Sequence, residues 1–210
     1  MAKKKILLDI DEVVCFCGIL QAVNDFMGTN YKIDDFTDYY IDEVAVPKEF
    51  FNDFNEFLKY RNLYEVPDFL PKAIETLERL NEHFDIYVCS SCINPLDLEN
   101  SGRIYQDKFN FIRKFLPFLD PKKIIFTSSK NIFKADIQID DRIGNLDPEV
   151  ETKILFPSYH NKDITDEELK EKGIIRAGYE WRTGWEELEK TLMGLLVKEE
   201  NQSMTYSKTQ

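Results

Sequence analysis

The sequence has no hydrophobic run long enough to cross a membrane. Its longest apolar stretches have the length of strands, far short of the roughly 20 residues that a spanning helix needs. The apolar run after Lys5 ends at Asp9, too short for the about 7–15 apolar residues of a secretory signal. The sequence therefore predicts no membrane partner and a cytoplasmic location.

Positive charge is scarce. Lys and Arg number 27 against 39 Asp and Glu, which gives a net charge of −12. Such a chain repels a phosphate backbone, so we expect no binding to long nucleic acid. A small phosphorylated ligand stays compatible with this charge, because one bound metal ion reverses the local field.

Cysteine is also scarce, and a cytoplasmic location favours reduced thiols over disulfides. The four cysteines form two closely spaced pairs, Cys15 with Cys17 and Cys89 with Cys92. The paired spacing leaves a structural zinc site or a redox role open. The favoured interpretation is that they are small apolar residues of the core.

Short apolar runs alternate with amphipathic segments along most of the chain. The runs predict buried strands, and apolar residues at helical spacing predict helices. The expected strands cover Lys4–Ile10, Asp85–Cys89, Lys123–Thr127, Asp136–Ile139, Lys153–Phe156 and Ile174–Ile175. The expected helices cover Pro71–His83, Arg103–Leu116 and Trp185–Val197. The predicted fold class is α/β, a Rossmann-like, mostly parallel sheet with helices on both faces.

One stretch, residues 16–66, lacks a buried strand and is rich in aromatic residues. We expect a small helical cap there, inserted after the first strand of a core domain made of residues 1–15 and 67–200. Most of its aromatic side chains should form the cap's own core. Phe16, Phe50 and Phe51 are the candidates for contact with a substrate, since aromatic rings stack on nucleobases. The polar tail 201–210 is expected to be disordered.

Polar side chains follow four of the expected strands where each strand ends. In chain order they are Asp9 and Asp11, Ser90, Lys130, and the pair Asp140 and Asp141. Parallel strands bring their carboxyl ends to one edge of the sheet, so these side chains should meet there. Grouped carboxylates need a cation, and Mg²⁺ suits carboxylate and phosphate oxygens. The arrangement predicts metal-assisted phosphoryl transfer, for which an Asp can be the nucleophile.

The order of these residues resembles the four motifs of the haloacid-dehalogenase superfamily of phosphohydrolases, and most closely the 5′(3′)-deoxyribonucleotidases. The resemblance covers Lys4 to about Asp147 and places the cap where that superfamily has its first cap type. Lys130 precedes Asp140 by ten positions, as in the third and fourth motifs of the nucleotidases. A Leu-Ile-Asp-Asp-Arg run is matched here by Gln-Ile-Asp-Asp-Arg at 138–142.

The resemblance implies a Mg²⁺-dependent phosphomonoesterase that forms an aspartyl-phosphate. Asp9 would be the nucleophile, and Asp11 the general acid and base. Mg²⁺ would bind the Asp9 carboxylate, the backbone carbonyl of Asp11 and Asp140. The implied substrate is a small phosphorylated molecule, in the first place a nucleoside or deoxynucleoside monophosphate.

Three further residues take supporting roles in this scheme. Ser90 and Lys130 would hold the phosphoryl oxygens, and Asp141 would position metal-bound water or Lys130. Lys134 competes with Lys130 for the phosphate role, but the ten-residue spacing favours Lys130. His160 is expected to have a surface or capping role rather than a place near the site.

Three positions depart from the family pattern. Glu12 follows Asp11 where many members have Gly, Cys17 stands where the nucleotidases have an aromatic residue, and Ser128 stands where they have Arg. The alternatives left open are a phosphatase for a sugar phosphate or an oligonucleotide 3′ end, and a phospho-acceptor signalling or binding domain. A homodimer is also left open.

Overall fold

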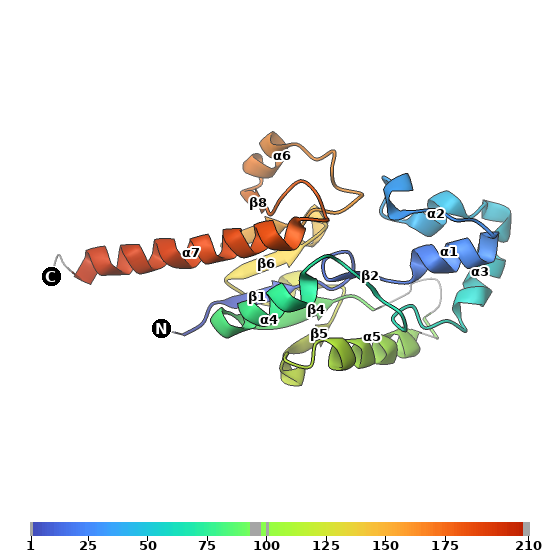
Figure 1. Ribbon diagram of the computed structural model, residues 1–210, viewed down its shortest axis with the longest axis horizontal. Coiled ribbons are helices and arrows are strands. Elements are labelled where there is room, and N and C mark those ends of the chain that lie inside the picture. The colour runs from blue at the N-terminus through green and yellow to red at the C-terminus, as the bar shows by residue number, and fades with distance from the viewer. Residues whose placement is uncertain (1, 93–97, 100, 208–210) are drawn as a thin grey trace.

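A six-stranded parallel sheet forms the centre of the computed structural model, which describes residues 2–92, 98–99 and 101–207 (Figure 1). The strand order is β5-β4-β1-β6-β7-β8, and each neighbouring pair is parallel. The strands are β1 (Lys5–Leu8), β4 (Asp85–Ser90), β5 (Ile124–Phe126), β6 (Ile137–Asp140), β7 (Thr152–Leu155) and β8 (Ile174–Arg176). The predicted α/β fold is confirmed, and each expected strand lies within about two residues of its observed bounds.

The sheet is built around β1, which pairs with β4 on one side and with β6 on the other. Ile6 lies opposite Ile86 and Ile137 in this register, and all three are buried. Near-continuous apolar runs suit such central strands, because both faces of a parallel sheet are covered. Because all six strands of this sheet run in the same direction, their carboxyl ends lie together at one edge of the sheet. This edge faces the helices inserted after β1 (Figure 1).

Helices pack around this sheet, and the longest of them extends well beyond it. They are α4 (Ala73–His83), α5 (Ser101–Phe115), α6 (Asp166–Glu171) and α7 (Gly184–Ser207), with 3₁₀ turns at Pro121–Lys123, Lys130–Ile132 and Ile143–Asn145. Helices α4 and α7 pack on one another through buried leucines such as Leu77 and Leu188. Helix α7 runs on to Ser207, through residues expected to be disordered, since no Gly or Pro interrupts it after Gly194. Residues 208–210 lie outside the described part.

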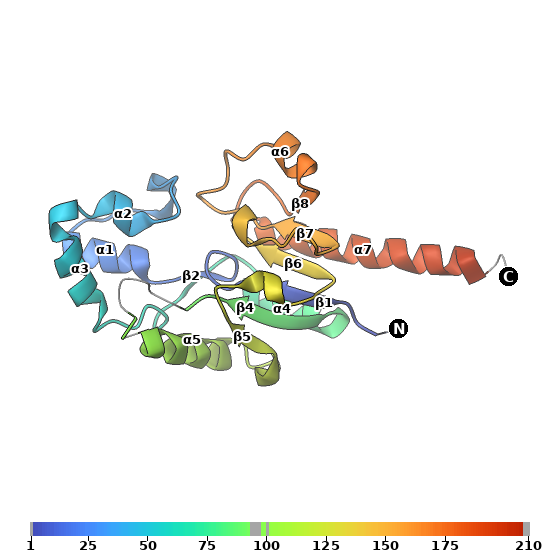
Figure 2. The ribbon, with the colours of Figure 1, turned by 180° about the vertical axis from the view of Figure 1, so that it is seen from behind.

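The segment between β1 and α4 carries the inserted helices. They are α1 (Ile19–Met27), α2 (Ile41–Ala45) and α3 (Phe51–Leu58), with 3₁₀ turns at Ile33–Asp35 and Lys48–Phe50. Figures 1 and 2 show them grouped beyond the carboxyl ends of the strands. Phe54 is fully buried among them and its ring lies 5.3 Å from that of Phe26. Aromatic side chains thus form the core of this small unit.

Two short strands, β2 (Cys15–Phe16) and β3 (Asp68–Phe69), pair antiparallel at the two ends of the insertion. The sequence did not predict them, because two residues are too few to show a period. Helix α6 was missed for a similar reason, since its six residues are mostly charged.

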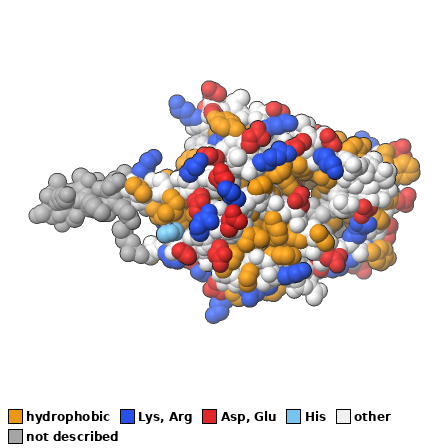
Figure 3. Space-filling view, in the orientation of Figure 1, with side chains coloured by type: hydrophobic (Ala, Val, Ile, Leu, Met, Phe, Trp, Pro, Cys, Tyr) orange, Lys and Arg blue, Asp and Glu red, His pale blue; other side chains and the backbone are white. Residues whose placement is uncertain are grey.

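The surface in the view of Figure 3 carries acidic and basic side chains intermixed. Among the helices of the described ranges, none combines the length and the apolar sequence that crossing a bilayer requires.

Candidate active site

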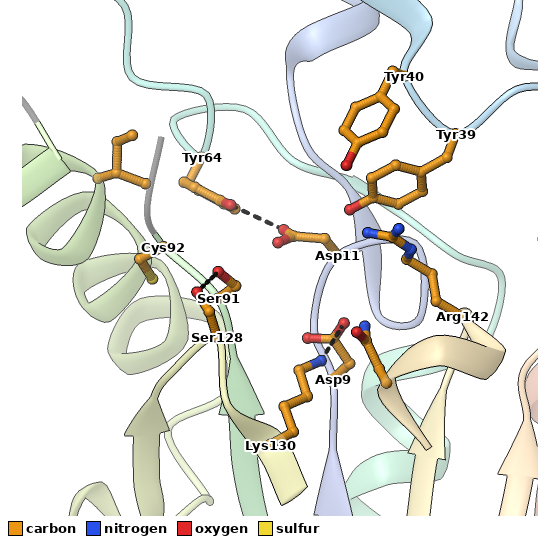
Figure 4. Close-up of a pocket in the computed structure, with 12 residues that line it drawn as sticks. Asp9, Asp11, Tyr39, Tyr40, Tyr64, Ser91, Cys92, Ser128, Lys130 and Arg142 are labelled. Atoms are coloured by element: carbon orange, nitrogen blue, oxygen red, sulfur yellow. Dashed lines mark hydrogen bonds and ion pairs between the residues drawn. The ribbon is translucent and has the colours of Figure 1, made fainter. Parts of the chain in front are cut away.

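Strand pairing brings Asp9 and Asp140 together at the edge of the sheet. Asp9 follows the last residue of β1, and its backbone N–H donates to the carbonyl of Ile139 at 3.1 Å. The next residue of β6 is Asp140. The Lys130 Nζ lies 2.8 Å from Asp9 Oδ2 (Figure 4). It also lies 2.6 Å from Asp140 Oδ2. Lys130 thus joins the two carboxylates, whereas Lys134 is exposed.

Asp140 and Asp141 are both buried, with 1% of each residue exposed. The Oδ1 atom of Asp140 accepts hydrogen bonds from the Arg142 backbone N–H at 3.0 Å and from the Asn145 amide at 2.9 Å. Together with Lys130, these donors fix the orientation of the carboxylate. Such fixed orientation is what a ligand of a metal ion requires.

Three carboxylates meet here with too little positive charge. One oxygen from each of Asp9, Asp140 and Asp141 lies within 4.8 Å of the others. Burial and the negative charge of Asp9 raise the pKa of Asp140 to about 8 and that of Asp141 to about 7. Burial also opposes the ionisation of Asp9, but Lys130 and Lys108 outweigh it and hold the pKa of Asp9 below its usual value. A divalent cation would relieve this repulsion, and an all-oxygen donor set fits Mg²⁺.

A second lysine, Lys108 on α5, completes the site, and sequence reasoning missed it. Its side chain is 0% exposed, and its Nζ lies 2.5 Å from Asp11 Oδ2. The same ammonium donates to Ser90 Oγ at 2.9 Å and to the Ser91 carbonyl at 2.7 Å. Burial by itself would lower the pKa of Lys108, but the Asp11 and Asp9 carboxylates raise it above its usual value. Lys108 therefore remains charged and links Asp11 to the end of β4.

The sequence did contain a signal for Lys108. It lies three and four residues before Phe111 and Ile112, which are both buried on α5. It thus occupies a position of the apolar stripe of an amphipathic helix. A lysine at such a position is buried, and a buried lysine needs an acidic partner.

A cavity of about 410 Å³ opens above these groups. Its lining includes Asp9, Asp11 and Lys130 from the core, and Tyr39, Tyr40 and Tyr64 from the insertion (Figure 4). The Tyr64 hydroxyl donates to Asp11 Oδ1 at 2.9 Å. The Arg142 guanidinium lies 4.2 Å from the centre of the Tyr39 ring. The insertion thus provides an aromatic wall opposite the carboxylates.

The aromatic residues chosen from the sequence, Phe16, Phe50 and Phe51, do not line this cavity. Phe16 is buried and its ring lies 5.1 Å from that of Trp181. Phe50 is exposed, and Phe51 packs against the hydrophobic core. Sequence spacing identifies aromatic residues on helices, whereas Tyr39, Tyr40 and Tyr64 lie outside the helices of the insertion.

His160 also lies at the site, contrary to the expectation of a surface or capping role. Its side chain is 8% exposed, and its Nε2 lies 2.7 Å from Asp141 Oδ2. The physical reason is that β7 pairs with β6, so the loop after β7 begins at the edge where Asp141 lies. Asn161 holds this loop in place by donating to the carbonyls of Asp141 at 2.7 Å and Phe156 at 2.8 Å.

The cysteines take no part in the potential metal sites. Among the residues that the structure describes, two groups of side chains could hold a metal ion, and neither contains a cysteine. All four thiols are free, and Cys15, Cys89 and Cys92 are buried. Burial raises the pKa of Cys89 to about 11 and that of Cys92 to about 12. These properties agree with the favoured interpretation of small apolar core residues.

Comparisons with known proteins identify a family to which the sequence is similar. The family model described as 5′ nucleotidase, deoxy (pyrimidine), cytosolic type C protein matches residues 3–172. A putative 5′(3′)-deoxyribonucleotidase of Staphylococcus aureus is 30% identical over 163 residues, 77% of this chain and 86% of that protein. The 5′(3′)-deoxyribonucleotidase of Bacillus subtilis is 25% identical over 197 residues, 91% of this chain and 99% of that protein.

Among solved structures, a putative haloacid dehalogenase-like hydrolase of Burkholderia xenovorans is similar to this chain with a TM-score of 0.48 and 10% sequence identity. The superposition covers 89% of this chain and 96% of that chain. The family match spans the motifs from Asp9 to Asp141, and the predicted class of phosphoric monoester hydrolase is confirmed. The chain belongs to the family of 5′ nucleotidases of the deoxy (pyrimidine), cytosolic type C kind.

Proposed function

We propose that the protein is a Mg²⁺-dependent phosphatase of deoxynucleoside monophosphates that works through an aspartyl-phosphate on Asp9. The observation that carries the proposal is the pair of buried lysines. Lys130 lies between Asp9 and Asp140, and Lys108 lies between Asp11 and Ser90. Two fixed cations within an acidic site favour a phosphoryl group with its negatively charged oxygens.

Asp9 is suited to be the nucleophile. Its Oδ1 accepts a hydrogen bond from the Ile10 N–H at 2.8 Å, and its Oδ2 faces Lys130. These contacts and the lowered pKa keep the carboxylate ionised at neutral pH. The hydrogen bonds also fix its direction, which lowers the entropic cost of an in-line attack on phosphorus.

Asp11 is suited to be the general acid and base. In the substrate-free site its two oxygens are held by Lys108 and by the Tyr64 hydroxyl. A bound phosphoryl group would compete for the Lys108 ammonium. Asp11 would then lose its ion pair and be free to face the leaving group. It would give a proton to the departing alkoxide and take one back from the attacking water.

The carboxylates of Asp9 and Asp140, with the backbone carbonyl of Asp11, would hold the metal ion. A bound Mg²⁺ would shield the anionic phosphate from the Asp9 carboxylate and stabilise the charge that develops on the phosphoryl oxygens. Asp140 keeps its orientation through Arg142 and Asn145.

The substrate class follows from the cavity and the relatives together. The relatives named above are 5′(3′)-deoxyribonucleotidases. A cavity of about 410 Å³ with three tyrosines in its lining suits a nucleoside with a planar base. Stacking of a base on an aromatic ring contributes roughly 1–3 kcal/mol in other systems.

The test is the release of phosphate from a panel of esters, with Mg²⁺ and with a chelator. The panel holds deoxynucleoside and ribonucleoside 5′- and 3′-monophosphates, sugar phosphates, and oligonucleotides with a 3′-phosphate. We expect Mg²⁺-dependent release with the highest kcat/KM for deoxynucleotides. Preference for a sugar phosphate or an oligonucleotide end would reject the substrate assignment. No release from any ester would favour a signalling or binding domain.

A further inference from the structure

Glu12 has an unusual backbone conformation and an unusual environment. It follows Asp11 in the loop after β1, and its φ angle is 59°, in the left-handed region that favours glycine. Its side chain is nevertheless buried, with 6% exposure. Its Oε2 atom has no hydrogen-bond partner among the described residues. A buried carboxylate oxygen without a partner is costly, so its retention calls for a physical explanation.

The unpartnered oxygen is directed toward His160 and Asp141. Glu12 Oε2 lies 3.9 Å from His160 Nε2, which in turn lies 2.7 Å from Asp141 Oδ2. One ligand atom from each of the three residues lies within 4.8 Å of the others. The lysines of the active site bind other carboxylates, Lys130 at Asp9 and Asp140 and Lys108 at Asp11.

The imidazole of His160 is held in place from two sides. The rings of Tyr39 and Tyr159 both meet it edge-on, with centroids 5.1 Å and 5.2 Å away. Its Nε2 atom faces the carboxylates of Glu12 and Asp141, and an imidazole nitrogen is a common ligand of metal ions. Tyr39 also lines the cavity of about 410 Å³.

We propose that Glu12, Asp141 and His160 form a second cation site, which takes a divalent transition-metal ion such as Zn²⁺, Co²⁺ or Mn²⁺. A donor set of one imidazole and two carboxylates suits these ions, whereas Mg²⁺ prefers oxygen donors alone. Binding at Nε2 leaves the single proton of the neutral imidazole on Nδ1, and the metal ion replaces the hydrogen bond between Nε2 and Asp141. Asp141 belongs both to this site and to the group of Asp9, Asp140 and Asp141, so the two cations would be neighbours. This inference goes beyond the proposed phosphatase activity and does not depend on it.

The test is a metal-binding measurement that needs no substrate. The full chain is stripped with a chelator, saturated with Mg²⁺ in large excess, and titrated with Co²⁺. Bound Co²⁺ is counted after equilibrium dialysis and followed by its visible absorption. We expect one equivalent of Co²⁺ per chain that excess Mg²⁺ does not displace.

Variants identify the ligands. His160→Gln and Glu12→Gln should each weaken Co²⁺ binding by more than about 10-fold. His83→Gln changes the only other histidine, which is exposed at the end of α4, and should bind Co²⁺ like the unaltered chain. Asp140→Asn alters the group of Asp9, Asp140 and Asp141 and leaves Glu12, Asp141 and His160 unchanged. This variant should still bind one equivalent of Co²⁺.

Two results would overturn the proposal. One is an unaltered chain that keeps no Co²⁺ in excess Mg²⁺, a result that does not depend on whether any variant folds. The other is a His160→Gln variant, folded by circular dichroism, that binds Co²⁺ as tightly as the unaltered chain. In that case the ion sits among Asp9, Asp140 and Asp141 and not at the imidazole.

Discussion

Lys108 gives the most specific prediction of the site, because its ammonium is fully buried and makes three contacts. We consider Lys108→Met, which keeps most of the length of the side chain and removes the charge. Three groups lose a donor: Asp11 Oδ2 at 2.5 Å, Ser90 Oγ at 2.9 Å and the Ser91 carbonyl at 2.7 Å. The proposed transition state loses one of the two fixed cations that would meet the phosphoryl oxygens.

The magnitude follows from the value of one fixed donor in such a site. Removal of a preorganised donor to a developing anion costs about 2.7–4 kcal/mol, which corresponds to roughly 10²–10³-fold in kcat. We therefore expect kcat for a deoxynucleoside monophosphate to fall by about 10²–10³-fold. Lys108→Arg should not restore it, because a planar guanidinium needs more room than this buried position offers.

The assay is phosphate release in Mg²⁺, with circular dichroism to establish that each variant is folded. The matched control is Lys114→Met on the same helix, because Lys114 is exposed and should leave kcat close to that of the unaltered chain. A folded Lys108→Met variant with kcat within about threefold of the unaltered chain would refute the reasoning, since it leaves less than about 1 kcal/mol for the lost ammonium.

Three further predictions concern single side chains. In metal-free protein, the Glu12→Gly variant should unfold at a temperature about 2–4 °C higher than the Glu12→Ala variant. Only glycine relieves the strain of the left-handed backbone at residue 12, which stabilises the fold by about 1 kcal/mol. Equal melting temperatures would mean that the backbone is not strained. Lys130→Ala should lower kcat by at least about 10²-fold, and Lys134→Ala should have little effect; the reverse order would assign the phosphate role to Lys134. Burial raises the pKa of Cys92 to about 12. At pH 8 the thiol should therefore react with iodoacetamide about a thousandfold more slowly in the native chain than in urea-unfolded protein. Rapid labelling of Cys92 in the native chain would contradict this.

The sequence was sufficient for the sheet and for the residues at the ends of its strands. Near-continuous apolar runs such as those of β1 and β6 have one structural explanation in a chain of this kind, a strand covered on both faces. The order of a parallel sheet then places Asp9, Ser90 and Asp140 at one edge. The structure brings these residues together as expected, with Lys130 between Asp9 and Asp140.

The site residues that sequence reasoning missed were those whose position depends on tertiary contacts. Lys108 looks like one more charge on an amphipathic helix until its position in the apolar stripe is noticed. His160 follows a predicted strand, but its distance from Asp141 depends on the turn that Asn161 fixes. Tyr39, Tyr40 and Tyr64 could not be chosen among the many aromatic residues of the insertion, because spacing along the chain does not reveal which rings face the core.

The central claim is that Asp9 accepts the phosphoryl group. The most direct measurement is chemical trapping of the intermediate in the unaltered chain during turnover, since Asp11 would serve both its formation and its hydrolysis. After brief incubation with a deoxynucleoside monophosphate and Mg²⁺, borohydride reduces an aspartyl-phosphate to homoserine, and peptide mass spectrometry identifies the position. The account predicts homoserine at residue 9, dependent on substrate and absent from Asp9→Asn. An enzyme that hydrolyses the nucleotide but carries no homoserine at residue 9, or carries it at another aspartate, would contradict the account.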